Sequence, residues 1–312
     1  MEFSEKVSFV REKMVMSQEE LARALKDNSQ PTYKRQRFLL AFMRHLDSGV
    51  SATDLQKLVF LHTRDNNTNF YEFIPNKFGA YSFQLAEDVK TLRKGGFLSD
   101  EGERIKAIGE YAQDGLFDIA AERGNNLIRK SYRDYPYYTI NSELTDRIFY
   151  RAEDKERFNN EKMKYVLPGQ VLFTIGYEGK SIEAFINELI RNGIKLLCDV
   201  RKNPLSRKYG FSKSKLEHIT GTVGIKYIHI PDLGIESNKR NSLETYKDYQ
   251  SLFADYSETL PNLDPYLKWV YSLLCSNVRI ALMCYEKDAV MCHRHIIKDY
   301  IAGTHEVRSA DL

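Results

Sequence analysis

The stretch Val171-Leu-Phe-Thr-Ile-Gly-Tyr-Glu178 opens the part of the chain whose sequence pattern defines a fold. It is an apolar run of strand length, and residues 181–192 follow it with the apolar spacing of an amphipathic helix. A second apolar run covers residues 194–200. A strand, a helix and a strand in this order predict a parallel βαβ unit with a right-handed crossover. Further strands are expected at residues 225–230 and 279–285, and further helices at 245–260 and 264–275. The C-terminal half is therefore predicted to be a parallel α/β sheet with helices on both faces.

Ionisable side chains follow three of these predicted strands at the point where each strand ends. In strand order they are Tyr177 and Glu178, Asp199 and Arg201, and Cys284 and Glu286. Ligands bind to open α/β sheets outside the carboxyl ends of the strands. Because three separate strands deliver such groups to one edge, we expect a binding site or an active site there.

Three carboxylates at this edge are the candidate catalytic groups: Glu178, Asp199 and Glu286. A carboxylate beside an arginine can position or deprotonate a water molecule, while the arginine stabilises developing negative charge. This combination would serve hydrolysis of an N-glycosidic or phosphoester bond in a nucleotide or nucleic acid. An alternative role for Asp199 is an ion pair that fixes the following loop. The carboxylates could also hold a divalent metal, and no other cofactor is indicated.

The last predicted strand leads through a short loop into a helix that is expected to open with Cys292, His293 and Arg294. A helix N-terminus carries unpaired N–H groups and partial positive charge, so these residues predict an anion site. Cys292 could instead act as a nucleophile, but the spacing from Cys284 to Arg294 is not that of the cysteine phosphatases. A zinc site that adds Cys284 and His295 is disfavoured, because no paired Cys-x-x-Cys is present.

The segment between the second strand and the next helix, residues 201–215, contains six lysines and arginines and no acidic residue. Positive charge, aromatic faces, a hydroxyl and a glycine suit a phosphate-bearing partner. The alternative is an ordinary solvated loop. We expect a nucleotide, a nucleic acid or a nucleotide sugar to bind here. The residues expected to contact it are Tyr177, Arg201, Ser206, Arg207, Lys213, Cys292, His293 and Arg294.

The N-terminal part of the chain has mainly helical patterns. Helices are expected within residues 1–30 and at 34–46, 51–61 and 82–92, with an aromatic extended stretch over residues 70–82. Further helices are expected at residues 103–117, 118–129 and 151–162, the last of them highly charged and exposed. Basic residues of this part would form a nucleic-acid or partner surface, or would simply be solvated. They are Arg35, Arg37, Lys57, Lys77, Arg93 and Lys94.

Seven motifs run through the C-terminal half in a fixed order. They are Thr174-Ile-Gly-Tyr-Glu-Gly179, Asp199-Val-Arg201, Pro204-Leu-Ser-Arg207, Gly210-Phe-Ser-Lys213, Gly224-Ile-Lys-Tyr227, Leu233-Gly234 and Cys284-Tyr-Glu-Lys-Asp-Ala-Val-Met-Cys-His-Arg294. These motifs resemble those of the DUF488 family over about residues 170–305. The resemblance implies a Rossmann-like fold with a shared polar site, and it implies no particular reaction.

Shorter motifs in the N-terminal part, at residues 55–60, 71–73, 78–82 and 92–97, resemble the winged-helix-like modules of bacterial regulators and antitoxins. We therefore expect a winged-helix-like helical domain over residues 1–100, a helical and charged connector over 101–168, and a DUF488-like α/β domain over 169–312. The two resemblances together suggest a bacterial or phage-related setting, such as phage defence.

Composition limits the classes of protein that the chain can represent. Its net charge is +3 over 312 residues, so attraction for nucleic acid must come from local patches. Four cysteines without framework spacing favour a reducing cytoplasm. No apolar run approaches the roughly 20 residues that span a bilayer, so no membrane association is expected.

Two functional interpretations follow. In the first, the α/β domain is a hydrolase acting on a nucleotide or nucleic acid, and the N-terminal domain recruits nucleic acid or a protein partner. In the second, the α/β domain senses a nucleotide without turnover, and the N-terminal domain binds DNA or a protein. The sequence does not predict an oligomeric state.

Overall fold

The computed structural model describes residues 31–46, 48–109, 117, 119–240 and 245–312. The helix expected within residues 1–30 lies outside these ranges. Contacts divide the chain into two compact units, Met1–Tyr71 with Gln84–Leu127 and Glu72–Phe83 with Ile128–Leu312. This division differs from the boundaries expected at residues 100 and 168. The aromatic segment and most of the expected connector belong to the unit that contains the α/β sheet.

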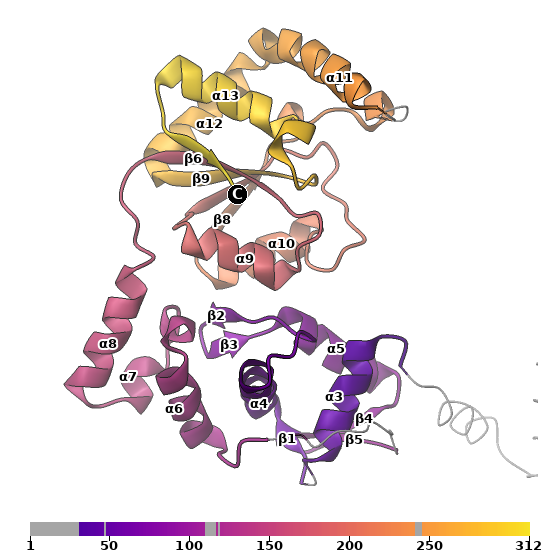
Figure 1. The fold of residues 1–312 in the computed structure, drawn as a ribbon, viewed down its shortest axis with the longest axis vertical. Helices are drawn as coiled ribbons and strands as arrows, with labels where there is room; N and C mark the ends of the chain where they lie inside the picture. The colour runs from indigo at the N-terminus through magenta and orange to yellow at the C-terminus, as the bar shows by residue number, and fades with distance from the viewer. Residues whose placement is uncertain (1–30, 47, 110–116, 118, 241–244) are drawn as a thin grey trace, which may run out of the picture. The chain divides into compact units, whose positions relative to one another are not determined.

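The first unit combines helices with a small antiparallel sheet (Figure 1). In chain order its elements are α3 (Lys34–Arg44), β1 (Val50–Ser51), α4 (Ala52–Asp65), α5 (Phe83–Lys94), β4 (Leu98–Glu101) and β5 (Arg104–Ala107). The strands pair in the order β1-β5-β4. Ser51 caps α4, because its hydroxyl accepts a hydrogen bond from the Asp54 N–H over 3.1 Å. The core contains Phe38, Phe42 and Leu58.

The helix expected at residues 103–117 is wrong over residues 104–107, which form β5 and pair with β4 in a hairpin, and residues 110–116 of that expectation lie outside the described ranges. Glu101 pairs with Arg104 across a two-residue turn, and Gly102 in that turn has φ +64°. Glycine adopts positive φ without a steric penalty, which suits a tight hairpin turn. Leu98 and Ile105 supply the buried side of the hairpin.

The second unit contains a five-stranded sheet in which every neighbouring pair is parallel. Its strands are β6 (Val171–Gly176), β7 (Leu196–Asp199), β8 (Lys226–His229), β9 (Arg279–Cys284) and β10 (Ser309–Asp311), in the order β10-β6-β9-β7-β8. The predicted parallel α/β sheet is confirmed. The sequence did not indicate β10, which extends the sheet beside β6.

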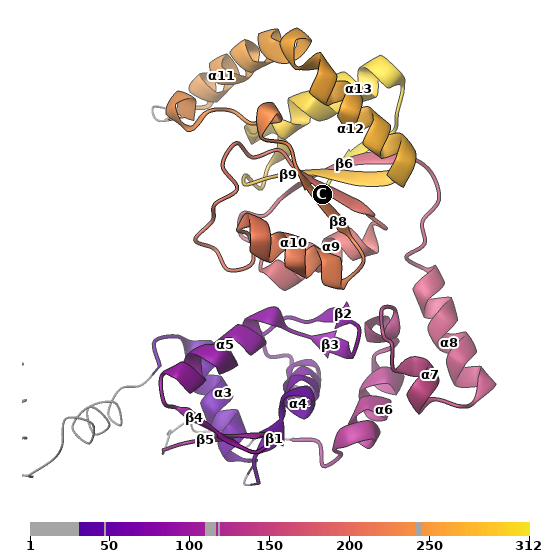
Figure 2. The same ribbon diagram turned by 180° about the vertical axis from the view of Figure 1, so that it is seen from behind.

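Helices cover both faces of this sheet (Figures 1 and 2). One face is covered by α9 (Ile182–Arg191) and α10 (Lys213–Thr222), and the other by α12 (Asp264–Asn277) and α13 (Arg294–His305). α11 (Tyr246–Thr259) packs with α12 and α13. The apolar side chains of α9 that were predicted to face inward, among them Phe185 and Leu189, are buried. The helices therefore leave the carboxyl ends of the strands to their loops.

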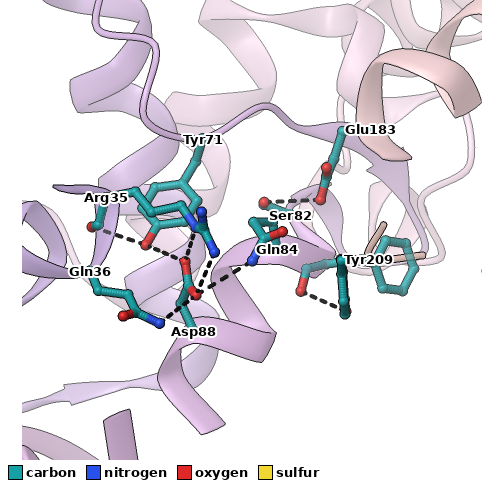
Figure 3. A network of polar contacts seen from close by, with 9 residues as sticks. Arg35, Gln36, Tyr71, Ser82, Gln84, Asp88, Glu183 and Tyr209 are labelled. Atoms are coloured by element: carbon teal, nitrogen blue, oxygen red, sulfur yellow. Dashed lines mark hydrogen bonds and ion pairs between the residues drawn. The ribbon is translucent and has the colours of Figure 1, made fainter. Parts of the chain in front are cut away.

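The remaining elements of the second unit precede the sheet in the chain. They are the antiparallel pair β2 (Ile74–Asn76) and β3 (Gly79–Tyr81), then α6 (Gly124–Asp134), α7 (Thr145–Ile148) and α8 (Ala152–Met163). Asn187 on α9 donates a hydrogen bond to the Phe73 carbonyl over 2.8 Å, and Ser82 donates one to Glu183 (Figure 3). α8 is mostly exposed, with Phe158 buried. In the part of the chain that the structure describes, no helix is long and apolar enough to cross a membrane.

Candidate functional site

The carboxyl ends of β6, β9 and β7 meet at one edge of the sheet. Gly176 at the end of β6 pairs with Cys284 at the end of β9, and Asp199 at the end of β7 pairs with Met283. β6 and β7 lead to helices on one face, whereas β9 leads to α13 on the other face. β9 is thus flanked by two points at which the connections diverge, the location where open α/β sheets bind ligands.

The loops after β6 and β9 lie in direct contact. The N–H groups of Tyr177 and Glu178 both donate to the Tyr285 carbonyl, over 3.1 and 2.9 Å. A side chain at Gly176 would place its Cβ 1.8 Å from the Glu286 carbonyl oxygen, so only glycine fits there. This close approach explains why the motif Thr174–Gly179 has glycine at position 176.

A pocket of about 360 Å³ opens at this edge. It is lined by Tyr177, Arg201, Lys202, Asn203, Leu205, Ser206, Arg207, Ile235, Cys284 and Tyr285. Three of these side chains are basic and, among the described residues, none of those lining the pocket is acidic. Four of the residues expected to bind ligand line it: Tyr177, Arg201, Ser206 and Arg207. The pocket is therefore suited to an anionic ligand.

Asp199 lies beneath the pocket with both oxygens engaged. Oδ1 accepts a hydrogen bond from Nε of Arg201 over 2.8 Å, and Oδ2 accepts one from Nη2 over 2.5 Å. The Tyr227 hydroxyl also donates to Oδ2 over 2.7 Å, and burial together with Asp199 raises the pKa of Tyr227. Asp199 is fully buried. This geometry is that of the alternative foreseen from the sequence, an ion pair that fixes the loop, rather than that of a catalytic carboxylate.

Arg201 is the link between this ion pair and the pocket. Its Nη1 donates to the Tyr177 hydroxyl over 3.1 Å and to the Phe211 carbonyl over 2.9 Å. Arg201 is 6% exposed, and it is one of the residues that line the pocket. Its guanidinium is thus oriented on three sides before any ligand binds.

Arg294 has a different position from the one expected. Its side chain is fully buried, and Nη1 and Nη2 donate to the carbonyls of Glu286 and Lys287 over 2.7 and 2.9 Å. Nε donates to the Thr174 hydroxyl over 3.3 Å. The sequence led us to expect phosphate on this guanidinium, but its donors hold the loop after β9 instead. Among the described residues, those lining the pocket include neither Arg294 nor Lys213, Cys292 or His293.

The two other candidate carboxylates lie on the loops that border the pocket. Glu178 is exposed, and its Oε2 accepts a hydrogen bond from the Lys287 N–H over 3.0 Å. Glu286 is partly buried, and its backbone is held by Arg294. Each of the two directly follows a tyrosine that lines the pocket, Tyr177 or Tyr285. Among the described residues, neither carboxylate is one of those that line the pocket, so both stand on its border.

Cys292 lies close to Cys284 and His293 in the core below the pocket. Burial raises the pKa of the Cys292 thiol well above its usual value, and the neighbouring Cys284 adds to this effect. A thiol in this environment stays protonated at neutral pH, which disfavours its role as a nucleophile. The Cys284, Cys292 and His293 ligand atoms lie within 4.8 Å of one another, so these residues could hold a metal ion.

The basic residues expected to form a surface in the N-terminal part do not share one environment. Lys57 is buried, and burial lowers its pKa to about 7. Arg35 is bonded to Asp88, which also accepts from Gln36 and Tyr71 (Figure 3). Arg37 donates to the Pro31 carbonyl, and Arg93 pairs with Asp100 over 2.8 Å. Lys94 is exposed at the end of α5, whereas Lys77 is exposed between β2 and β3 of the second unit.

Several pocket residues were not singled out from the sequence. Lys202, Asn203 and Leu205 fall inside the basic segment 201–215, so its charge pattern could have indicated them. Tyr285 lies between two candidate residues in sequence. Ile235 carries no local signal. It follows Gly234, where a side chain would place its Cβ 2.3 Å from the backbone nitrogen of Lys202.

Comparison with known proteins agrees with the resemblance of the C-terminal motifs. Residues 181–301 match the family model described as "Domain of unknown function DUF488". No curated protein and no solved structure matches the chain. The matched range includes the loop after β7, all of β9 and the first two thirds of α13, which build most of the pocket and the core below it. The C-terminal region of this protein therefore carries a DUF488 domain.

Proposed function

We propose that the DUF488 domain binds a phosphate-bearing ligand, a nucleotide or a nucleic-acid strand, in the pocket at the carboxyl ends of β6, β7 and β9. One observation carries this proposal: Arg201, Lys202 and Arg207 line a pocket whose described lining residues include no acidic side chain. Arginine forks and lysine suit phosphate oxygens, and Tyr177 and Tyr285 offer aromatic faces to a base.

Arg201 is the preorganised group of this site. The Asp199 ion pair and the Tyr177 hydroxyl fix its guanidinium, so little conformational entropy is lost when an anion binds. Arg207 is exposed, and Lys202 forms an ion pair with the exposed Glu236, with Nζ and Oε1 2.7 Å apart. These two side chains can therefore adjust to the ligand.

The reaction that we propose is hydrolysis of an N-glycosidic or phosphoester bond. Glu286 is the preferred base, because it follows the pocket residue Tyr285 and its backbone is anchored by Arg294. It would deprotonate the attacking water molecule, while Arg201 and Arg207 stabilise the negative charge that develops on the phosphoryl oxygens and the leaving alkoxide, or on the leaving base when the N-glycosidic bond is the one broken. Asp199 is assigned a positioning role through Arg201 rather than a catalytic one.

The test is incubation of the full chain with duplex DNA, single-stranded DNA, RNA and a nucleotide panel, with and without Mg²⁺, followed by mass spectrometry of the products. We expect a released base, nucleotide or phosphate that Glu286→Gln fails to produce although it still binds. Glu178→Gln is the matched carboxylate control on the neighbouring loop. If the wild-type chain binds a species that survives gel filtration but forms no product, the hydrolase proposal is wrong.

A second function, that of a nucleotide-sensing regulator, is favoured by the topology of the first unit. Its order of helix, strand, helix, helix, strand, strand, with the sheet β1-β5-β4, supports the winged-helix-like interpretation of this part. Lys90, Arg93 and Lys94 lie exposed on α5. In this interpretation α5 contacts DNA or a protein partner, and ligand in the pocket changes that affinity. A bound ligand that alters DNA affinity without turnover would select this function.

A further inference from the structure

Two cysteines and a histidine meet in the core directly below the pocket. Cys284 ends β9, whereas Cys292 and His293 precede α13. One ligand atom from each, Sγ, Sγ and Nδ1 or Nε2, lies within 4.8 Å of the others. Cys284 and Cys292 are each 1% exposed and His293 is fully buried. Three metal-ligating side chains thus converge in a dry environment.

The observed spacing matches the dimensions of a tetrahedral zinc site. Zn–S and Zn–N bonds of about 2.3 and 2.0 Å at tetrahedral angles place sulfur and nitrogen about 3.5 Å apart. In the structure, Sγ of Cys292 lies 3.7 Å from Nδ1 of His293. Little rearrangement is therefore needed for both atoms to bind one ion.

The orientation of His293 is that of a metal ligand supported by the backbone. Its Nε2 lies 3.1 Å from the Val200 carbonyl oxygen, which can only accept a hydrogen bond. Nε2 therefore donates to this carbonyl, and Nδ1 faces Sγ of Cys292. Metal-bound histidines usually donate their other N–H in this way, which fixes the tautomer and the ring. The Tyr256 ring, 5.5 Å from the imidazole, closes the other side.

The chemistry of the three ligands selects the kind of ion. Two thiolates and an imidazole suit zinc and similar soft or borderline cations, whereas Mg²⁺ and Ca²⁺ require oxygen ligands. Binding of the ion would release the two thiol protons to solvent, and the resulting two thiolates and one divalent cation sum to zero charge, which suits a fully buried position. The sequence argument against zinc rested on the absence of a Cys-x-x-Cys pair. That argument fails here because the strand end and the helix start supply the ligands from two elements.

We propose that Cys284, Cys292 and His293 form a binding site for one zinc-type divalent cation beneath the pocket. Three protein ligands leave a fourth position for water or for a group of a bound ligand. Cys284 also lines the pocket, so we place this fourth position on the pocket side. The metal site does not depend on the proposed hydrolysis, because metal can be measured without any substrate.

The test is metal analysis of the full chain after loading with Zn²⁺ under reducing conditions and dialysis against metal-free buffer. We expect one zinc per chain by elemental mass spectrometry, and an at least tenfold lower content in Cys284→Ser and Cys292→Ser. Cys198→Ala is the matched control, because Cys198 is equally buried on the neighbouring strand β7 and lies outside the cluster. An excess of Mg²⁺ should not displace the zinc.

A second measurement uses the wild-type chain alone, in case the variants fail to fold. Co²⁺ added to the metal-free chain should give the visible bands of a tetrahedral site and a near-ultraviolet thiolate-to-metal band, and Zn²⁺ should abolish both. Absence of bound zinc and of these cobalt bands in the wild-type chain would overturn the proposal. Zinc retained by folded Cys284→Ser and Cys292→Ser chains would overturn it as well. Neither result bears on whether a phosphate-bearing ligand is bound or hydrolysed.

Discussion

The guanidinium of Arg201 donates to both carboxylate oxygens of Asp199, from Nε to Oδ1 over 2.8 Å and from Nη2 to Oδ2 over 2.5 Å. The two residues are separated by one position in sequence, and two tyrosines from other parts of the sheet complete the hydrogen bonding of the pair. The Tyr227 hydroxyl donates to Asp199, and the Tyr177 hydroxyl accepts from Arg201. The pair joins the end of β7 to the pocket. Its integrity therefore decides both the stability of this edge and the orientation of the pocket arginine.

Replacement of Asp199 by alanine should destabilise the α/β domain strongly. The change leaves the charge of Arg201 buried without its partner, which costs about 3–5 kcal/mol. Urea denaturation would measure the free energy of unfolding. Glu236→Ala is the control, because it breaks the exposed pair with Lys202 and should cost less than about 1 kcal/mol. Equal losses in the free energy of unfolding for the two variants would contradict the assignment of Asp199 as the buried partner that holds Arg201.

Arg294→Ala and Arg207→Ala should separate stability from binding. Removing the buried Arg294 leaves the carbonyls of Glu286 and Lys287 without a donor, so we expect a loss of about 3 kcal/mol or more. Arg207 is exposed at the pocket, and its removal should weaken binding of ADP or a single-stranded oligonucleotide about tenfold with little change in stability. Denaturation and calorimetric titration of both variants check this. An Arg294→Ala chain of normal stability would refute the structural role of Arg294.

Lys57→Met should stabilise the protein at neutral pH and lose this advantage in alkaline solution. Burial lowers the pKa of Lys57 from 10.5 to about 7, and nearby Asp54 only partly opposes the shift. Between these pH values the unfolded chain binds a proton that the folded chain does not, so stability due to this group rises with pH from about 7 to about 10.5. Urea denaturation followed by circular dichroism at pH 6.5 and 9.5 measures the difference.

The matched control for this prediction is Lys90→Met, which removes an exposed lysine of α5 in the same unit. It should shift stability little at either pH, since a solvated ammonium has no burial penalty. A constant gap between Lys57→Met and the wild-type chain at the two pH values would show that Lys57 is charged in the folded protein.

Charge reversal on α5 should weaken any binding of the chain to duplex DNA. Lys90→Glu combined with Lys94→Glu removes two exposed positive charges from this helix. If α5 contacts phosphates, the slope of log K against log salt should become shallower by about two, because fewer counterions are released. Lys155→Glu with Lys162→Glu on α8 changes the net charge equally and serves as control. Identical losses in both double variants would indicate non-specific attraction.

Much of the fold followed from local pattern. The apolar runs and the amphipathic spacing of residues 181–192 predicted β6, α9 and β7 to within a few residues. β5 was mistaken for helix because both strands of its hairpin are short and charged, and only the cross-strand pairing of Leu98 and Ile105 with their partners reveals the hairpin. β10 was missed for the same reason, since three residues carry too little pattern.

The sequence by itself determined that the sheet is parallel and at which edge polar groups gather, because alternating strand and helix patterns predict parallel strands joined by right-handed crossovers. Only the tertiary structure decided what each polar group contacts. Arg294 donates to Thr174, which lies 120 residues earlier in the sequence, and its guanidinium is hydrogen-bonded inside the protein. Arg207, in contrast, is exposed at the pocket. Burial and hydrogen-bond partners come from segments far apart in the chain, and they separate a bracing arginine from a binding one.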